Sequence, residues 1–570
     1  LGEANRPDVE TRAVIETFCL RTDFTDPVVD EARRAAKGFS GDVKNREDLT
    51  DRLIFTIDPP DARDFDDAIS ITYDEDREEW ELGIHIADVA HFVKSGSELD
   101  TEALARGNSA YLPQQVLPML PEVLSNGVCS LQEDVPRYTK SAFVRLNKSG
   151  RVLDQRLART LIRSRKRLTY LEAQAVIDGD NTLARKHSKT SPVYGDDLIE
   201  ALRRADTLAR LIRERRLKSG MFVLAMPEFE LVFDDDGHVI DAQPEDNAFT
   251  HTIIEMFMVE ANEAVARTFA DLGVPLIRRV HPQPPYHDVS ELRDYARIIG
   301  LGLPEEPNRF DIKRLLDATR ESPAARAIHF AVLRTLTKAE YSPALIGHYA
   351  LAGEHYAHFT SPIRRYPDLL VHRVVDAFLD HTDNGKTVSG GKARRKFREK
   401  LNGDSRVLSD NALVELGRHC TDTEINAEHA ERELRTFLVM QFIKENHLGD
   451  EFDAVITHAT GGGVIFASLD RLLVEGIAQT SDLGSGTRED RWSIDDRSGR
   501  LVAQRSGASI GLGDQVRVKI MRVDLAARQL DVAIVEFKDT APRMIKQRDD
   551  GRGRGRHTGV INRKGKGKGK

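Results

Sequence analysis

The sequence feature that most constrains the fold is an acidic stretch enclosed by two apolar runs. Residues 56–68, TIDPPDARDFDDA, contain five aspartates, and the two prolines among them favour an open, extended loop. The flanking residues 53–57 and 68–71 are mainly apolar and predict two short buried strands. Two strands that end beside this loop would bring several carboxylates close together.

Clustered carboxylates interact strongly, because each one raises the pKa of its neighbours unless a cation neutralises them. Magnesium is a hard divalent ion that prefers oxygen ligands. The pattern therefore predicts a magnesium site, and the ligands that we expect are Asp58, Asp64, Asp66 and Asp67. A solvated acidic turn is the alternative, since aspartate is a common turn residue. A calcium-binding EF-hand loop is excluded, because Ile69 stands where that loop requires glycine.

A second motif, HFTSPIRRYPD, spans residues 358–368. Ser361 followed by Pro362 predicts the start of a helix, because serine is a good N-cap and proline suits the first turn. Free backbone N–H groups at such a helix start, with Arg364 beside them, are suited to bind a phosphate. The alternative is an ordinary helix on which Arg364 forms an ion pair with Asp368.

Both motifs closely resemble the catalytic signatures of the RNase II/RNase R family of exoribonucleases. The longer segment HYALAGEHYAHFTSPIRRYPDLLVHR is similar to the family's second signature almost residue for residue. A further similar run, YLPQQVLPMLPEVLSNGVCSL, begins at Tyr111. The resemblance covers about residues 10–537. It is closer to RNase R than to RNase II, because of the sequences ARDFDDA and HFTSPIRRYPDL and the basic tail.

The resemblance implies roles for individual residues. The residues expected to hold magnesium and to be required for cleavage are Asp58, Asp64, Asp66 and Asp67. Arg364 matches the arginine that reaches the scissile phosphate, and Glu431 matches a glutamate near the leaving nucleotide. The RNA-binding residues that it implies, with Tyr111 and Phe222 stacking at the RNA end, are Tyr111, Phe222 and, as a weaker candidate, Arg365. Without the resemblance, Tyr111 would be an ordinary buried aromatic residue and Glu431 part of a surface charge pair.

The predicted fold class is α+β, with a large mixed α/β RNB catalytic domain, a small all-β OB-fold barrel and a disordered basic tail. From residue 449 the pattern changes to short alternating strands with glycine turns, which predicts a five-stranded barrel. The predicted parts are a linker remnant at 1–48, the catalytic domain at 49–445, the RNA-binding barrel at 449–537 and the low-complexity tail at 540–570. The resemblance also implies two N-terminal cold-shock domains that this sequence, which begins with Leu1, lacks, because they have been cut away or were never recorded.

Two further segments carry predictions about structure. Residues 80–93 predict a strand, a turn and a second strand. His85, Asp88 and His91 in this segment are interpreted as structural residues rather than a metal triad, because their spacing suits no single strand face. Residues 139–158 predict a hairpin with the turn NKSG.

The formal net charge of −9 by itself argues against a nucleic-acid-binding protein. The distribution of charge argues the other way. Residues 551–570 contain eight Arg or Lys and no acidic residue, which favours salt-sensitive binding of RNA. Basic residues also cluster at 151–170 and in a helix predicted at 202–218. We interpret these two clusters as walls of a channel that follows RNA phosphates, with solvated faces as the alternative.

The composition, with 40% hydrophobic and 31% charged residues among 570, is typical of a globular protein. No apolar run approaches the ~20 residues that a membrane span requires. The three cysteines, Cys19, Cys129 and Cys420, are far apart, which fits a reducing compartment and excludes a zinc cluster built on cysteine. We therefore expect a cytoplasmic monomer that contacts no membrane.

The expected function, as the resemblance implies, is processive 3′-to-5′ hydrolysis of single-stranded RNA to nucleoside 5′-monophosphates with magnesium. Such an enzyme serves RNA decay and quality control. Two alternatives stay open. A non-catalytic RNA-binding relative would lack the carboxylates, whereas all four are present here. A metal-dependent phosphodiesterase acting on DNA or small nucleotides would share the aspartates, and a comparison of RNA with DNA of one sequence separates it.

Overall fold

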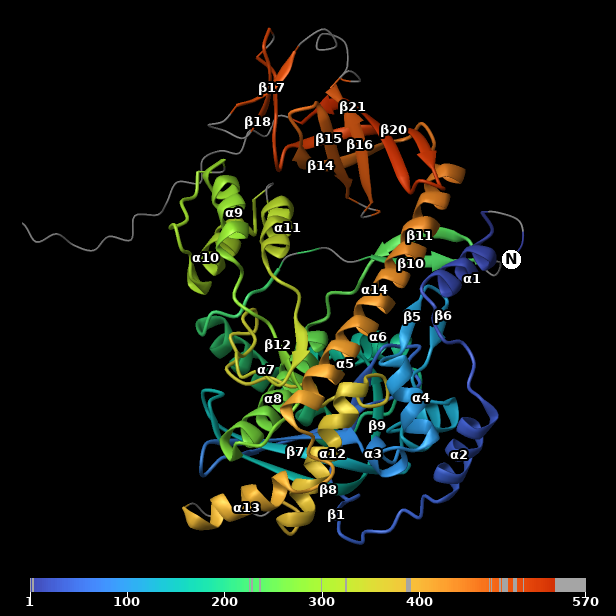
Figure 1. Ribbon diagram of the computed structural model, residues 1–570, viewed down its shortest axis with the longest axis vertical. Helices are drawn as coiled ribbons and strands as arrows, with labels where there is room; N and C mark the ends of the chain where they lie inside the picture. The colour runs from blue at the N-terminus through green and yellow to red at the C-terminus, as the bar shows by residue number, and fades with distance from the viewer. Residues whose placement is uncertain are drawn as a thin grey trace, which may run out of the picture.

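The structure is a computed structural model. It describes residue 2 and residues 5–538, except for 225, 227, 228, 235, 236, 299, 323, 324, 386–390, 471, 473, 481, 482, 484–490, 496–499 and 506. The basic tail predicted for 540–570 lies outside the described residues. Figure 1 shows a sheet-containing module at one end of the molecule and a small barrel at the other, joined by one long helix.

A seven-stranded mixed sheet forms the centre of the larger module, with the strand order β1-β8-β7-β4-β3-β2-β9. Its strands are β1 (Glu47–Leu49), β2 (Phe55–Asp58), β3 (Asp67–Asp74), β4 (Glu79–Ala87), β7 (Pro136–Asn147), β8 (Val152–Arg163) and β9 (Lys166–Thr169). The two strands predicted around the acidic stretch are β2 and β3, which run antiparallel. The predicted hairpin is β7 and β8, and its turn contains Gly150 at φ +72, a conformation that favours glycine.

The second strand predicted within residues 80–93 is wrong. After β4 the chain forms the short helix α3 (Val89–Phe92). Asp88 ends the strand: its N–H still donates to the Tyr138 carbonyl at 3.0 Å, but its carboxylate turns inward to buried cations. The structural interpretation of His85 agrees with the geometry, because its ring lies buried between the hydroxyls of Ser70 and Ser141.

Helices cover the sheet and extend from it. The helical spacing of Ile253, Phe257 and Ala261 predicts a helix over residues 249–272, and α8 (Phe249–Leu272) is largely buried in the main core. The other helices of ten or more residues are α1 (Pro7–Thr17), α2 (Asp26–Lys37), α7 (Asp196–Lys218), α9 (Tyr286–Ile298), α10 (Arg309–Thr319), α11 (Ala325–Thr335), α12 (Tyr366–His381), α13 (Lys392–Asn402) and α14 (Asp410–Asn446). The shorter ones are α4 (Glu98–Arg106), α5 (Tyr170–Asp178) and α6 (Asn181–His187), with a π-helical turn at Val123–Val128.

Some of the basic residues that were expected to form channel walls form ion pairs within the protein. On β8, Arg159 forms ion pairs with Asp376 and Asp380. On α7, Arg216 is buried against Glu260 and Glu263. These two side chains therefore hold elements of the fold together.

The C-terminal barrel confirms the predicted fold class. Five strands close in the order β14-β15-β16-β21-β20. They are β14 (Glu451–Ala459), β15 (Val464–Leu469), β16 (Glu475–Gln479), β20 (Gln515–Asp524) and β21 (Gln529–Phe537). The apolar core of the barrel continues into the end of α14, where Phe437 and Met440 join it. Figure 1 shows α14 running from the larger module to the barrel.

Smaller sheets complete the fold. The strand set at the barrel that the sequence did not predict is β17 (Trp492–Asp495), β18 (Arg500–Ala503) and β19 (Ser509–Ile510). The two-stranded pairs are β5 (Ala110–Leu112) with β6 (Gln115–Leu117), β10 (Phe229–Phe233) with β11 (Val239–Pro244), and β12 (Arg278–Val280) with β13 (Glu340–Ser342). Among the described residues, no helix combines the length and apolar character that crossing a membrane requires.

Candidate active site

The acidic stretch lines a cavity of about 880 Å³ in the larger module. Asp58 is the last residue of β2 and Asp67 is the first residue of β3, so the two strands place both side chains at one edge of the sheet. The loop between the strands supplies Asp64 and Asp66 to the same cavity. Sequence reasoning therefore grouped these four aspartates as the fold does.

The second motif lies beside the aspartates in the fold, although almost 300 residues of sequence separate them. The backbone N–H of Ile363 donates to Asp66 Oδ1 at 2.9 Å. Arg364 Nε lies 3.7 Å from Asp66 Oδ2, and its Nη2 donates to Ser361 Oγ at 3.1 Å. Ser361 and Arg364 both line the cavity. Arg364 and the four aspartates, which the sequence assigned to one reaction, thus face the same cavity.

The helix start predicted at Ser361 is wrong, because α12 begins at Tyr366. Ser361 N–H donates to Asp368 Oδ1 at 2.8 Å, which folds the preceding residues back over the helix terminus. The predicted alternative ion pair between Arg364 and Asp368 does not form either. Asp368 is fully buried and instead binds Arg365, at 2.8 and 2.9 Å. Arg364 is thereby left to face the cavity.

The aspartates lie in an environment that opposes their ionisation. Burial raises the pKa of Asp58 and of Asp66 well above the usual range, and the charge on Asp67 adds to the effect on Asp58. Burial also raises the pKa of Asp67 to about 6, although Arg364 and Arg365 act in the opposite direction. The pKa of Asp64 is raised by burial as well. A nearby cation would reverse these shifts by favouring the ionised carboxylates.

The donor set of the cavity fits a hard divalent cation. Asp58 Oδ2 and Asp66 Oδ2 are buried without a hydrogen-bond partner, which is a costly state for a carboxylate oxygen. All the candidate ligands are carboxylate oxygens, the donors that magnesium prefers. Within the described part of the chain, no three His, Cys, Asp or Glu side chains already stand close enough to hold a metal ion together. The carboxylates would therefore close around an ion rather than receive it in a finished cage.

Two tyrosines line the same cavity. Tyr111, on β5, is 39% exposed and hydrogen-bonds Asp64, so it is not the ordinary buried aromatic residue of the alternative interpretation. Sequence reasoning missed Tyr170, the first residue of α5, whose ring stacks on His251 at 3.7 Å between centroids. The capping pattern of Thr169 and Glu172 marks this helix start in the sequence, but no local signal places it opposite the aspartates.

The remaining predicted residues lie at different places. A smaller adjoining cavity of about 180 Å³ is lined by Tyr111 and Arg364 together with Arg365 and Glu431. Glu431 is on α14, and burial raises its pKa. Phe222 lines neither cavity; its ring meets Tyr349 edge-on at 5.6 Å, in the core around α9, α10 and α11. The stacking of Phe222 with Tyr111 is therefore not formed in this structure.

The geometry agrees with comparisons to known proteins. Residues 46–381 match the family model described as the RNB domain. Ribonuclease R of Thermotoga maritima is 32% identical over 542 residues, which cover 94% of this chain and 72% of that protein. The structure of Mycoplasma genitalium RNase R with ribose-methylated single-stranded RNA has a TM-score of 0.79 and 27% identity, covering 94% of this chain and 79% of that one. The same protein with double-stranded RNA has a TM-score of 0.74, also at 27% identity, and covers 94% and 84%.

The cavity combines carboxylates with an arginine, and the fold combines a mixed sheet with an OB-like barrel. Together with these similarities, the two features define a ribonuclease of the hydrolase class. The chain belongs to the RNB-domain family, and its curated relatives are Ribonuclease R. It is accordingly a 3′-to-5′ exoribonuclease that acts on RNA.

Proposed function

We propose that this exoribonuclease hydrolyses single-stranded RNA processively to nucleoside 5′-monophosphates and uses magnesium as its metal. The residues proposed to hold the ion are Asp58, Asp64, Asp66 and Asp67. One observation carries the proposal: two buried carboxylate oxygens without a hydrogen-bond partner, on Asp58 and Asp66, share a cavity with Arg364.

In the proposed mechanism, the metal ion and the side chains of the protein have separate roles. When bound, magnesium activates a water molecule and stabilises the leaving oxygen. Arg364 neutralises the charge that develops on the phosphoryl oxygens. The Ile363 N–H holds one oxygen of Asp66 and leaves the other, Oδ2, for the ion. Ser361 Oγ steadies the Arg364 guanidinium at 3.1 Å.

Aromatic and acidic residues around this centre are proposed to hold the RNA end. Tyr111 stacks on a terminal base, a contact worth ~1–3 kcal/mol that tolerates any sequence. Glu431 lies in the smaller cavity beside Arg364, where a leaving nucleotide would pass. Arg365 reaches this cavity but is ion-paired with Asp368, and Phe222 would contact RNA only outside both cavities. The ribose 2′-OH is proposed to distinguish RNA from DNA.

The wider organisation is also proposed. We divide the chain into a linker at 1–48, a catalytic domain at 49–445, an RNA-binding barrel at 449–537 and a basic tail at 540–570. The protein would act as a monomer in the cytoplasm, in RNA decay and quality control. The three cysteines, which form no disulfide, are consistent with a reducing compartment.

The test is a time course on single-stranded RNA labelled at the 3′ or the 5′ end, with magnesium or with chelator. The 3′ label should appear at once as a mononucleotide. The 5′-labelled RNA should disappear without a ladder of intermediates until the final short product. Chelator should stop the reaction, and DNA of the same sequence should remain intact. Internal cuts, loss from the 5′ end, or full activity in chelator would contradict the proposal, and binding without cleavage would favour a non-catalytic RNA-binding role.

A further inference from the structure

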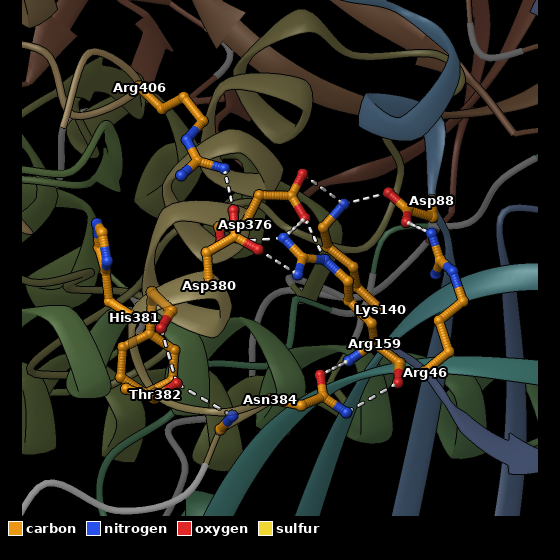
Figure 2. A network of polar contacts seen from close by, with 12 residues as sticks. Arg46, Asp88, Lys140, Arg159, Asp376, Asp380, His381, Thr382, Asn384 and Arg406 are labelled. Carbon is orange, nitrogen blue, oxygen red and sulfur yellow. Dashed lines mark hydrogen bonds and ion pairs between the residues drawn. The ribbon is translucent and has the colours of Figure 1, made fainter. Parts of the chain in front are cut away.

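A second cluster of carboxylates lies away from the cavity, between the sheet and α12. It is a chain of alternating charges (Figure 2) that we call the Lys140 network. Its members in order are Arg46, Asp88, Lys140, Asp376, Arg159, Asp380, Arg406 and Asp404. Four cations thus face four carboxylates, so the network is electrically balanced.

Lys140 is the centre of this network. It lies on β7 and its side chain is only 1% exposed. Its ammonium group forms ion pairs with Asp88, at the end of β4, and with Asp376 on α12, the latter at 3.1 Å. Burial alone would raise the pKa of Asp88, but Lys140 and Arg46 hold it well below its usual range. A single ammonium group therefore ties the sheet to the helix that follows the second motif.

The sheet and α12, the two elements that Lys140 joins, both continue to the aspartate cavity. On the sheet side, the residue before Asp88 is Ala87, whose N–H donates to the carbonyl of Asp66 at 2.9 Å. On the helix side, Asp368 lies eight residues before Asp376, about 12 Å along the helix axis at 1.5 Å per residue. Asp368 anchors Ser361 by a 2.8 Å hydrogen bond. The helix is thus held at two separated points, one beside the cavity and one at the Lys140 network.

We propose that the Lys140 network is a positioning device for catalysis: it sets α12 against the sheet so that Arg364 stands beside Asp66. Lys140 is then a positioning residue, since it acts through Arg364. The inference rests on the proposed role of Arg364 in the reaction. A displacement of about 1 Å is sufficient to cost ~100-fold in rate.

Physical chemistry explains why a charged connection serves this purpose. Burying ion pairs costs desolvation energy, so a well-packed apolar contact is often as stable or more stable. Charged pairs differ from apolar contacts in being directional, because each hydrogen-bonded ion pair accepts only a narrow range of geometries. Arg159 on β8 illustrates this directional binding. It donates to both the carboxylate and the backbone carbonyl of Asp376 on α12, at 2.8 and 3.0 Å.

The test removes one cation and one carboxylate together, so that the network stays balanced. In the double variant Lys140→Met/Asp376→Asn, Asp88 keeps Arg46 and Asp380 keeps Arg159. Single-turnover hydrolysis of a short 3′-labelled RNA should slow roughly ten- to a hundredfold. The Kd for the same RNA in chelator should stay unchanged. The matched control is Lys148→Gln/Glu78→Gln, an exposed ion pair at turns of the same sheet, which should leave the rate unchanged.

A double-mutant cycle with Arg364→Gln distinguishes positioning from simple loss of stability. If the network acts through Arg364, adding Lys140→Met/Asp376→Asn to Arg364→Gln should produce no further loss of rate. Multiplicative losses, or a double variant that keeps the full rate, would overturn the inference. Full activity of Arg364→Gln alone would instead overturn the proposed function.

A second variant covers the case in which removal of Lys140 prevents folding. Arg159→Gln/Asp380→Asn removes a balanced pair nearer the surface, where Asp380 is 44% exposed. Its rate should fall severalfold, and this loss should also vanish in the Arg364→Gln background. A loss that persists undiminished in that background would count against the proposal.

Discussion

Two clusters of carboxylates among the described residues, the aspartate cavity and the Lys140 network, differ in one respect. In the Lys140 network every carboxylate has a basic partner from the chain itself. In the aspartate cavity, Arg364 lies beside Asp66, and two oxygens, Asp58 Oδ2 and Asp66 Oδ2, have no hydrogen-bond partner. The same residue type therefore has opposite protonation behaviour: burial raises the pKa of Asp66, whereas Lys140 and Arg46 keep the pKa of Asp88 low.

This difference in charge balance indicates a structural role for the Lys140 network and a chemical role for the aspartate cavity. A balanced buried network is complete without a ligand, so its function is to fix geometry. An unbalanced cluster has an excess of negative charge, which a divalent cation can neutralise. Four changes test this contrast.

The largest effect is expected for Asp66→Asn, which removes one negative charge from the unbalanced cluster. The hydrolysis rate should fall by about a thousandfold or more, because an amide is a poor ligand for magnesium and cannot align Arg364. Single-turnover assays on labelled RNA measure this loss. Thermal unfolding in chelator should show no loss of stability, and an active Asp66→Asn variant would remove the cavity from the mechanism.

Lys140→Met without a compensating change should act on stability. It leaves the balanced network with an excess carboxylate, and breaking a buried pair in this way typically costs ~3–5 kcal/mol. Urea unfolding at pH 7 measures the free energy of unfolding. The control Arg156→Gln breaks an exposed pair with Glu47, for which a loss of at most ~1 kcal/mol is expected. Equal losses in the two variants would refute the contrast.

Arg364 and its neighbour Arg365 provide a matched pair inside the active site. Arg364→Gln should lower the rate by about a hundredfold with little change in melting temperature, because this side chain faces the cavity. Arg365→Gln should instead lower the melting temperature, because it leaves Asp368 buried without its cation. The interpretation fails if the two variants show the reverse pattern.

The smallest effect concerns pH. Asp67 has a folded-state pKa of about 6, above the ~3.9 of an unfolded chain, so the folded state holds this proton more tightly. In chelator, the free energy of unfolding contributed by this group therefore falls as pH rises from about 4 to 6. Magnesium binds the ionised form, so it should raise the melting temperature more at pH 7.5 than at pH 5. Asp67→Asn should reduce this difference, and an equal shift at both pH values would argue against metal binding at the aspartates.

Local sequence patterns predicted much of the fold. The apolar runs around the acidic stretch became β2 and β3, the spacing of Ile253 and Phe257 predicted α8, and the alternating pattern after residue 449 predicted a closed barrel. These features depend on interactions between residues near in sequence, or on burial of one face. The aspartates of the cavity were grouped for the same reason, since they lie within ten residues of each other.

Features that depend on distant partners were not predictable. The start of α12 moved to Tyr366 because Asp66 and Ser109, which are far away in sequence, hydrogen-bond the backbone of the preceding residues. Asp88 ended a strand because Lys140 and Arg46 attract its carboxylate. Tyr170 reaches the cavity because β9, which ends at Thr169, pairs with β2, which ends at Asp58. In each case a tertiary contact overrides what the local pattern favours.

The most direct test of the contrast between the two clusters is anomalous diffraction from crystals soaked in manganese, which replaces magnesium and can be located unambiguously. We predict an anomalous peak about 2.1 Å from carboxylate oxygens of Asp58 and Asp66, and none at Asp88 or Asp376. A peak within the Lys140 network, or none at the aspartates in crystals whose protein degrades RNA with manganese, would contradict the proposed metal site.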